Sequence, residues 1–272
     1  MSKLSTIRNI ILSGIIEYNL YKYDHICWIK TILYNGLWFG NAGLRHLPIL
    51  IYNNVEILSK GKILIDGEMS YGMVRLGIWK AKSHNKTRLM NFGTIVFKGD
   101  TVIQAGCVIE VYGGKIEFGR HNKFAESCKI MCNTNITIRD HVTVGYESTF
   151  MDTDFHFTID VNNYKVLRNE GKIIIGEGSW ISSNCKIMKG VKLPKYSVVC
   201  TNSLVLGDFS KYPETSMFAG IPAKPIKNGK RRIFDKELES KLLTSFRNNT
   251  DLEEIILKEN DLDSLCYGNK IL

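Results

Sequence analysis

A histidine with two acidic neighbours is the strongest chemical feature of this sequence. His156 follows Asp152 and Asp154 at two-residue steps in the segment Met-Asp-Thr-Asp-Phe-His-Phe. Because imidazole titrates near neutral pH, it can accept a proton from a hydroxyl group or an amine as a general base. Residues two apart in an extended segment project to the same side, so we expect one of the two carboxylates to orient the ring. The pattern does not say which one, and a histidine that only fills a turn is the alternative.

Metal and thiol chemistry are weaker alternatives. Zinc sites use clustered histidines or cysteines, and no two of His121, His141 and His156 lie within five residues of each other. Cys128 and Cys132 form a lone C-x₃-C pair without a second cluster, which small side chains at turns also explain. A cysteine could carry an acyl group as a thioester, but no cysteine neighbours His156. We therefore expect no metal site.

The elements that carry His156 follow a period of six residues, which neither a helix nor an ordinary strand has. Such a period predicts a short strand plus a corner, with three sides closing one turn and successive turns stacked ~4.8 Å apart. Three series of apolar residues follow this period, and His156 falls six residues after the last member of the third. His121 and His141 are expected at outward corners of the coil. The series are Ile175, Ile181, Ile187, Leu193, Val199 and Val205; Phe118, Phe124, Ile130 and Ile136; and Ile138, Val144 and Phe150.

The repeat predicts three parts along the chain. Residues 1–46 are expected to form a helical cap, and residues 47–227 the coil, with a loop ejected at 157–172. Within the coil, the Lys-, Asn- and Ser-rich residues 79–93 are expected to be a loop. Residues 228–272 are expected to form a helical extension, with helices at 235–243 and 251–257.

Composition excludes several classes. The net charge is +9, but Lys and Arg are spread along the chain without interleaved aromatic residues, so nucleic-acid binding is not predicted. No apolar stretch approaches the ~20 residues of a membrane span, and no signal peptide is evident. Seven cysteines scattered through the repeats suit a reducing compartment, which favours a cytoplasmic location.

Two segments carry a family resemblance. Trp180-Ile-Ser-Ser-Asn-Cys-Lys-Ile-Met-Lys-Gly-Val-Lys-Leu-Pro and Phe218-Ala-Gly-Ile-Pro-Ala-Lys-Pro-Ile-Lys resemble the hexapeptide-repeat acyltransferases, which include galactoside, maltose, serine and capsular-sugar acetyltransferases. The resemblance covers roughly residues 95–227. It implies a left-handed parallel β-helix, an all-β repeat fold, and direct transfer from acetyl-CoA with His156 as the base. It also implies a homotrimer, with the cofactor cleft between neighbouring chains.

The resemblance further implies site residues. Ser183, Thr201 and the motif residue Trp180 would contact acetyl-CoA, and the oxyanion would meet a backbone N–H near Ser182 or Ser183. Leu206 and Gly207 stand where a Thr-Lys pair is usual, so they can contribute only backbone. Lys224 and Lys227 would hold the cofactor phosphates. Glu126 and Asn133 fall at acceptor-contacting positions, but Glu126 replaces a usual asparagine and leaves the acceptor's identity open.

These observations together predict an acetyl-CoA-dependent O-acetyltransferase acting on a sugar or glycan precursor. An amino-sugar or nucleotide-sugar N-acetyltransferase is the alternative, because an ammonium group must also lose a proton before it attacks. A non-catalytic β-helix scaffold is the alternative from another class, since a fold does not determine a function.

Overall fold

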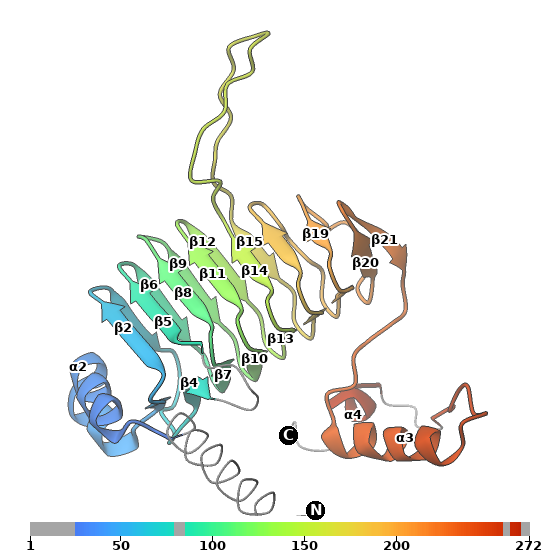
Figure 1. Ribbon diagram of the computed structural model, residues 1–272, viewed down its shortest axis with the longest axis horizontal. Coiled ribbons are helices and arrows are strands. Elements are labelled where there is room, and N and C mark those ends of the chain that lie inside the picture. The colour runs from blue at the N-terminus through green and yellow to red at the C-terminus, as the bar shows by residue number, and fades with distance from the viewer. Residues whose placement is uncertain (1–24, 79–84, 258–261, 268–272) are drawn as a thin grey trace, which may run out of the picture.

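The computed structural model describes residues 25–78, 85–257 and 262–267. Its strands wind into a long triangular prism with helices at both ends (Figure 1). As far as β17, every third strand pairs in parallel, and each of the three faces of the prism is one sheet. The predicted all-β repeat, a left-handed parallel β-helix with helices at its ends, is confirmed.

The three faces are named here in the order in which the chain visits them, and the edges between them are edge 1–2, edge 2–3 and edge 3–1. Face 1 consists of β1 (Ile49–Ile51), β4 (Val74–Ile78), β7 (Thr101–Gln104), β10 (Asn122–Phe124), β13 (Thr143–Val144), β16 (Trp180–Ile181), β18 (Val198–Val199), β20 (Met217–Gly220) and the antiparallel β21 (Ala223–Lys227). Face 2 consists of β2 (Val55–Ser59), β5 (Thr87–Asn91), β8 (Val108–Val111), β11 (Lys129–Cys132), β14 (Thr149–Met151), β17 (Lys186–Met188) and β19 (Leu204–Val205). Face 3 consists of β3 (Lys62–Ile65), β6 (Thr94–Phe97), β9 (Lys115–Phe118), β12 (Asn135–Ile138) and β15 (Ile173–Ile175).

The residues spaced six apart form the interior of the prism. Phe118, Phe124 and Phe150 are fully buried, and their rings contact at centroid distances of 5.5 and 6.1 Å. Burial of such apolar columns supplies the main driving force of the fold. His156 does not join them, because the chain leaves the coil after β14 and the ring stays exposed.

The corners of edge 1–2 repeat one backbone conformation. Ser127, Glu147, Asn184 and Asn202 all have φ of 59° to 60°, in the left-handed region. Each such residue costs about 1–2 kcal/mol, and hydrogen bonds between coils offset that cost. The Asn202 amide, for example, donates to the Ser183 carbonyl oxygen over 3.2 Å. The corners therefore stack in register along the whole edge.

One part of residues 79–93 is a strand rather than the expected loop. β5 pairs with β2 and β8 across face 2. Its sequence, Thr-Arg-Leu-Met-Asn, contributes one apolar residue, Leu89, to the core, and Thr87 is its only β-branched residue. The partner strands, not local propensity, hold it in the sheet. Residues 79–84 lie outside the described residues.

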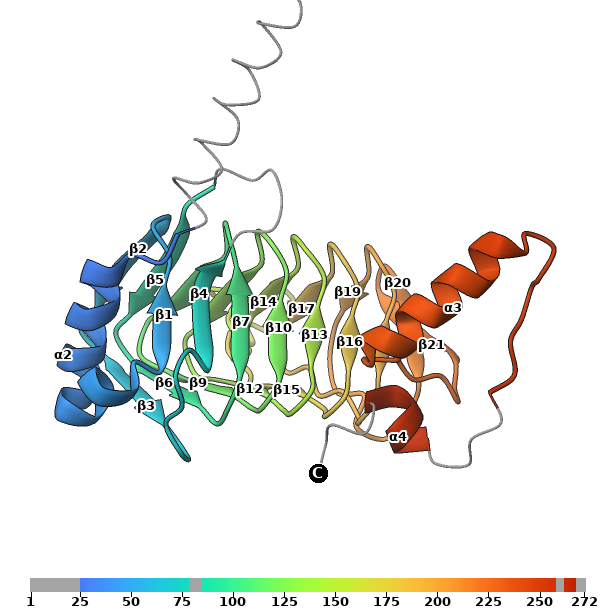
Figure 2. The same cartoon turned by 90° about the horizontal axis from the view of Figure 1, so that it is seen from below.

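A kinked helix covers the first coil. α2 runs from Trp28 to His46 and is interrupted at Gly40, where φ is 58° and ψ is −139°. It contacts β1 and β3 at one end of the prism (Figures 1 and 2). The expected helical cap spans residues 1–46, of which 1–24 lie outside the described residues.

Two helices follow the last coil. α3 spans Lys236–Asn248 and begins at Asp235, whose carboxylate accepts a hydrogen bond of 2.8 Å from the Leu238 amide. α4 spans Leu262–Tyr267 and packs near face 1 (Figure 2). The expected second helix at 251–257 is wrong, because those residues have no helical hydrogen bonding and the helix comes later, at α4.

Candidate active site

An arm leaves the coil at edge 2–3, between β14 and β15, and projects away from the prism (Figure 1). Its two strands form antiparallel bridges between Thr153 and Glu170 and between Ile159 and Val166. Asp160 orders the turn at the tip, because its backbone N–H donates to the Lys165 carbonyl over 2.9 Å. The coil resumes at Ile173. His156 lies near the root of this arm.

Lys189 fixes the root of the arm to the next coil. Its ammonium group lies 2.6 Å from an Asp154 carboxylate oxygen and donates a 2.8 Å hydrogen bond to the Arg168 carbonyl. One side chain thus holds both strands of the arm. Asn133, from the preceding coil, also donates a hydrogen bond to the Glu170 carboxylate. The root is therefore tied to the coils on both sides.

Asp152 is buried and holds a corner of the preceding coil. Its carboxylate accepts hydrogen bonds from the backbone amides of Asn133 (2.7 Å), Thr134 (2.9 Å) and Asn135 (2.8 Å), and from the Thr134 hydroxyl (2.9 Å). These four hydrogen bonds occupy the carboxylate lone pairs that a catalytic aspartate would use to accept a hydrogen bond from an imidazole.

The segment around His156 is not extended. Phe155 has φ of 60°, and its amide donates to the Thr153 hydroxyl over 3.0 Å, so the chain turns there. The expected alignment of both aspartates with His156 is therefore wrong. Asp152 faces the corner at 133–135, and Asp154 pairs with Lys189. The exposed ring of His156 is left facing solvent near the root of the arm.

Phe155, which directly precedes His156 in the sequence, contacts an aromatic residue that follows β8 of face 2. The Phe155 ring meets the Tyr112 ring edge to face, with centroids 5.5 Å apart. The Tyr112 hydroxyl donates a 2.6 Å hydrogen bond to Glu110, and burial together with that carboxylate raises the pKa of Tyr112 to about 12. This tyrosine therefore stays protonated at neutral pH. Its spacing from His156 gave no signal in the sequence.

The nearest buried thiol in this region is not reactive. Cys132 lies 3.6 Å from an Asp152 carboxylate oxygen, and burial followed by the charge of Asp152 raises the pKa of its thiol. A cysteine nucleophile acts as the thiolate, which these surroundings disfavour. The geometry thus supports the histidine rather than this cysteine.

The predicted site residues lie on two different edges of the prism. Glu126, Ser183 and Thr201 occupy equivalent corner positions on edge 1–2, with Tyr146 at this position on the coil between those of Glu126 and Ser183. Asn133 lies with His156 on edge 2–3, where Leu206 and Gly207 also follow β19. Face 2 separates the two sets, and its strands of two to five residues span roughly 7–17 Å. One chain alone does not bring them together.

The remaining predicted residues lie at or after the end of the coil. Lys224 and Lys227 are exposed on β21. Trp180 stands on face 1, and the Arg232 guanidinium lies over its ring at 5.2 Å. The C-terminal extension therefore covers part of the tryptophan, a contact that the sequence did not predict.

Face 2 carries a stripe of methionines on its outer side. Met90, Met131, Met151 and Met188 occupy the same register on successive strands, with Glu110 between the first two. Outward positions of a repeat prism are ordinarily polar where they meet solvent. The stripe lies between the two edges that hold the predicted site residues. It is spread over residues 20 or more apart in sequence, so sequence spacing did not reveal it.

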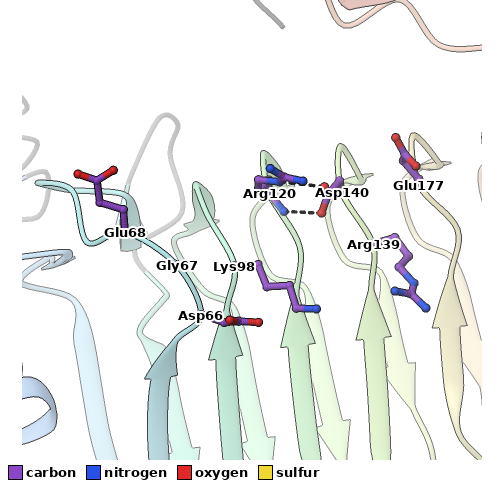
Figure 3. A pocket seen from close by; sticks show the side chains of 8 residues that line it. All are labelled: Asp66, Gly67, Glu68, Lys98, Arg120, Arg139, Asp140 and Glu177. Carbon is purple, nitrogen blue, oxygen red and sulfur yellow. Dashed lines mark hydrogen bonds and ion pairs between the residues drawn. The ribbon is translucent and has the colours of Figure 1, made fainter. Parts of the chain in front are cut away.

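Two hollows on the opposite side of the prism have other characters. One, of about 520 Å³, lies along edge 3–1 and is lined by charges of both signs (Figure 3). Arg120 and Asp140 pair there at 3.0 Å. The other, of about 470 Å³, lies between face 1 and α3 and includes His121 and His141.

His121 and His141 stack on each other rather than only facing solvent. Their ring centroids are 4.8 Å apart, and Tyr267 of α4 lies 4.6 Å from His141. Burial, followed by the charge of His121, lowers the pKa of His141. Within residues 25–78, 85–257 and 262–267, no group of three His, Cys, Asp or Glu side chains is placed to hold a metal. None of the helices in these ranges is both long and apolar enough to cross a bilayer.

Comparison with known proteins gives acetyltransferases. No family model matches the sequence. A chloramphenicol acetyltransferase of Klebsiella aerogenes is 34% identical over 99 residues, which are 36% of this chain and 42% of that protein. A protein of Lysinibacillus sphaericus named as a macrolide acetyltransferase is 28% identical over 57% of this chain and 84% of its own length. WbbJ of Escherichia coli K12, named as an O-acetyl transferase of lipopolysaccharide biosynthesis, is 24% identical over 54% of this chain and 80% of its own.

The matched part of this chain thus spans less than half of the Klebsiella protein and about four fifths of the other two. The described coil is built from short parallel strands joined at regular corners, with its core residues spaced six apart. This coil and these acetyltransferase relatives together support the resemblance of the chain to the hexapeptide-repeat acyltransferases.

Proposed function

We propose that this chain is an acetyl-CoA-dependent O-acetyltransferase that modifies a sugar or glycan precursor, with His156 as the general base. The observation that carries the proposal is the exposed imidazole near the root of the arm, which is tied to the coils on both sides through Lys189 and Asn133. A base must reach the acceptor's proton from a defined place. An exposed ring on a fixed root meets that requirement, whereas the histidines at edge 3–1 are stacked together.

The transfer is a direct one. The acceptor hydroxyl attacks the thioester carbonyl of acetyl-CoA while His156 takes its proton, and coenzyme A leaves as the thiol. A backbone N–H near Ser182 or Ser183 stabilises the oxyanion of the tetrahedral intermediate. Lys224 and Lys227 supply charge for the cofactor phosphates. The relatives are all described as acetyltransferases, which supports acetyl as the group that is transferred.

The working unit is a homotrimer in which neighbouring chains meet across face 2. Ser183 and Thr201 stand on one edge of this face and His156 on the other, so a site formed by one chain alone would be incomplete. If each copy presents edge 1–2 to edge 2–3 of the next copy, the two sets meet. The outward methionines of face 2 support this packing, since flexible thioether side chains adapt well to an apolar interface. Three equivalent contacts close a ring.

The acceptor class rests on the arm and on one relative. Tyr164 is exposed at the tip and offers an aromatic face for a sugar ring, and Arg168 is exposed near the root. WbbJ, named for lipopolysaccharide biosynthesis, supports a glycan acceptor and O-acetylation. The two antibiotic acetyltransferases favour a second candidate, a hydroxylated antibiotic. The location we propose is the cytoplasm, which suits the seven free cysteines.

The test is release of coenzyme A thiol from acetyl-CoA with a panel of sugars, amino sugars, chloramphenicol and a macrolide. We expect His156→Ala to lower kcat by roughly 10²–10⁴-fold, the usual contribution of a positioned base, with CoA affinity unchanged. His121→Ala, on the opposite side of the prism, is the matched control and should retain activity. Wild-type turnover in His156→Ala would remove this residue from the mechanism.

The product distinguishes the candidates. Hydroxylamine cleaves an O-acetyl ester but not an acetamide, so the stability of the product separates O- from N-transfer. Turnover of only chloramphenicol or the macrolide would identify an antibiotic, and not a glycan, as the acceptor. Absence of thiol release with every acceptor, together with no CoA binding, would favour a scaffold.

A further inference from the structure

The helix α2 contacts the coil through two polar side chains and through Tyr34, Trp38 and Phe39, which pack partly buried against the core. The Asn35 side chain donates to the Ile49 carbonyl over 2.7 Å and accepts from the Ile49 amide over 3.1 Å. The Thr31 hydroxyl accepts from the Ile51 amide over 3.1 Å. These bonds satisfy the open edge of β1, the first strand of face 1. Protecting a strand edge in this way avoids edge-to-edge aggregation, and it places the polar residues Thr31 and Asn35 on the buried side of the helix.

The outer side of α2 is apolar as well. Ile29, Leu33 and Leu37, spaced four apart, are 81%, 53% and 68% exposed, and Trp28 and Ile32 flank them. Lys30 is turned toward the coil, where its ammonium group donates to the Val55 carbonyl over 2.6 Å. A surface helix ordinarily shows charged residues on its outer face. A contiguous exposed apolar stripe of this kind marks a binding surface.

Basic residues surround this stripe, and α2 contains no acidic residue. Arg45 and His46 are exposed at the end of the helix. Lys60 and Lys62 are exposed on the first coil, next to and within β3, which α2 contacts. An apolar stripe with a tryptophan and a basic surround is the pattern of helices that lie in the interface of an anionic membrane.

We propose that the outer side of α2 docks the protein on the surface of an anionic lipid membrane. The charges favour lipid over a second copy of the chain. In a two-fold symmetric dimer formed through this surface, the basic residues around α2 of one copy would lie against the same residues of the other copy. Repulsion between these like charges would oppose the contact. Docking of this kind is peripheral, in keeping with the absence of a membrane-spanning helix from the described residues.

The position of α2 gives the docked protein an orientation. The helix lies beyond β1 at the end of the prism, so its outer side points along the prism axis (Figures 1 and 2). The prism axis would then stand roughly perpendicular to the membrane, with the first coil nearest to the lipid. β14, which precedes the arm, is four strands from β2 on face 2, about 19 Å at the usual strand spacing. The arm and His156 would thus stand within reach of an acceptor anchored in the same membrane. This last step alone rests on the proposed function.

Flotation of the full chain with lipid vesicles tests the docking without cofactor or acceptor. We expect the wild type to float with vesicles of phosphatidylcholine mixed with phosphatidylglycerol, less with phosphatidylcholine alone, and less at high salt. The triple variant Ile29→Ser, Leu33→Ser, Leu37→Ser should lower the partition coefficient about tenfold or more. A matched pair of exposed residues in the C-terminal extension, Leu243→Ser with Ile256→Ser, should leave it unchanged.

Four outcomes would overturn the proposal. The wild type fails to float with anionic vesicles; the triple variant floats as the wild type does; or the triple variant loses oligomer mass in light scattering, which would assign the surface to a second copy. Loss of flotation on removing residues 2–24, with the triple variant unaffected, would also contradict it. A blue shift of tryptophan emission on adding vesicles, lost in Trp28→Phe, supports the docking even if the triple variant folds poorly. Acyl transfer to a free acceptor should persist in the triple variant, so a failure of docking remains distinct from a failure of the proposed function.

Discussion

At the residue scale, the two aspartates before His156 have different roles. Asp152 is buried and accepts four hydrogen bonds from residues of the preceding coil, whereas Asp154 is exposed and pairs with Lys189. A buried carboxylate with several donors is costly to remove, because the donors, which are half-buried here, lose their partner. An exposed ion pair contributes little to stability.

We therefore predict that Asp152→Ala lowers the free energy of unfolding by about 3 kcal/mol, since four half-buried donors lose their acceptor and a fully buried unsatisfied donor costs ~1–3 kcal/mol. Asp154→Ala, two residues away, is the control and should cost about 0–1 kcal/mol. Urea unfolding followed by circular dichroism measures both. If Asp152→Ala kept its stability and lost only kcat, the residue would instead belong to the catalytic machinery.

At the element scale, the arm is a separable unit on a fixed root. Its contacts with the coil lie at Asp154, Arg168 and Glu170, and the residues between Phe157 and Leu167 are exposed. Changes in such an excursion should not reach the coil, since the corners on both sides keep their own hydrogen bonds.

Replacement of residues 158–167 by a short Gly-Ser linker should leave the melting temperature and CoA binding nearly unchanged. It should raise the KM for the true acceptor or abolish transfer, because the aromatic and polar groups of the arm would be lost. Steady-state kinetics with the acceptor found in the panel measures this. Lys189→Ala, which frees both strands at the root, should give a smaller change of the same kind. Unchanged kinetics in the linker variant would show that the arm has no part in acceptor choice.

At the scale of the whole molecule, face 2 is the surface that should join the copies. Lysine introduced into an apolar interface is disfavoured unless the charge finds a partner. Met131→Lys with Met151→Lys should therefore convert a trimer of about 93 kDa, three times the chain's 31.0 kDa, into monomers. Light scattering reads the mass, and thiol release should fall with it, because the two halves of the site separate.

Thr137→Lys, on the outer side of face 3 opposite Glu117, is the matched control and should change neither mass nor activity. A wild-type protein that is monomeric and fully active would contradict the shared site. A trimeric Met131→Lys, Met151→Lys variant would contradict the assignment of the interface to face 2.

The period of six residues determined the coil, its buried columns and the position of the arm, because each side of the prism repeats one local pattern. The candidate base and the candidate cofactor residues were identified from motifs in single segments, and they stay predictions. The structure decided three matters that spacing cannot express. Asp152 turned inward because its donors lie on the neighbouring coil, 17 to 19 residues earlier. β5 joined the sheet because its partners were strands, despite a loop-like sequence.

The third matter is which side of α2 faces water. Periodicity identifies an apolar side of a helix but not what it packs against, and the ordinary expectation is that this side covers the core. Here the open edge of β1 presents backbone groups that need hydrogen bonds, and Asn35 and Thr31 satisfy them. The cost of leaving those groups unpaired outweighs the exposure of Ile29, Leu33 and Leu37. Only the tertiary structure places that strand edge beside the helix, so only it determines which surface the molecule presents.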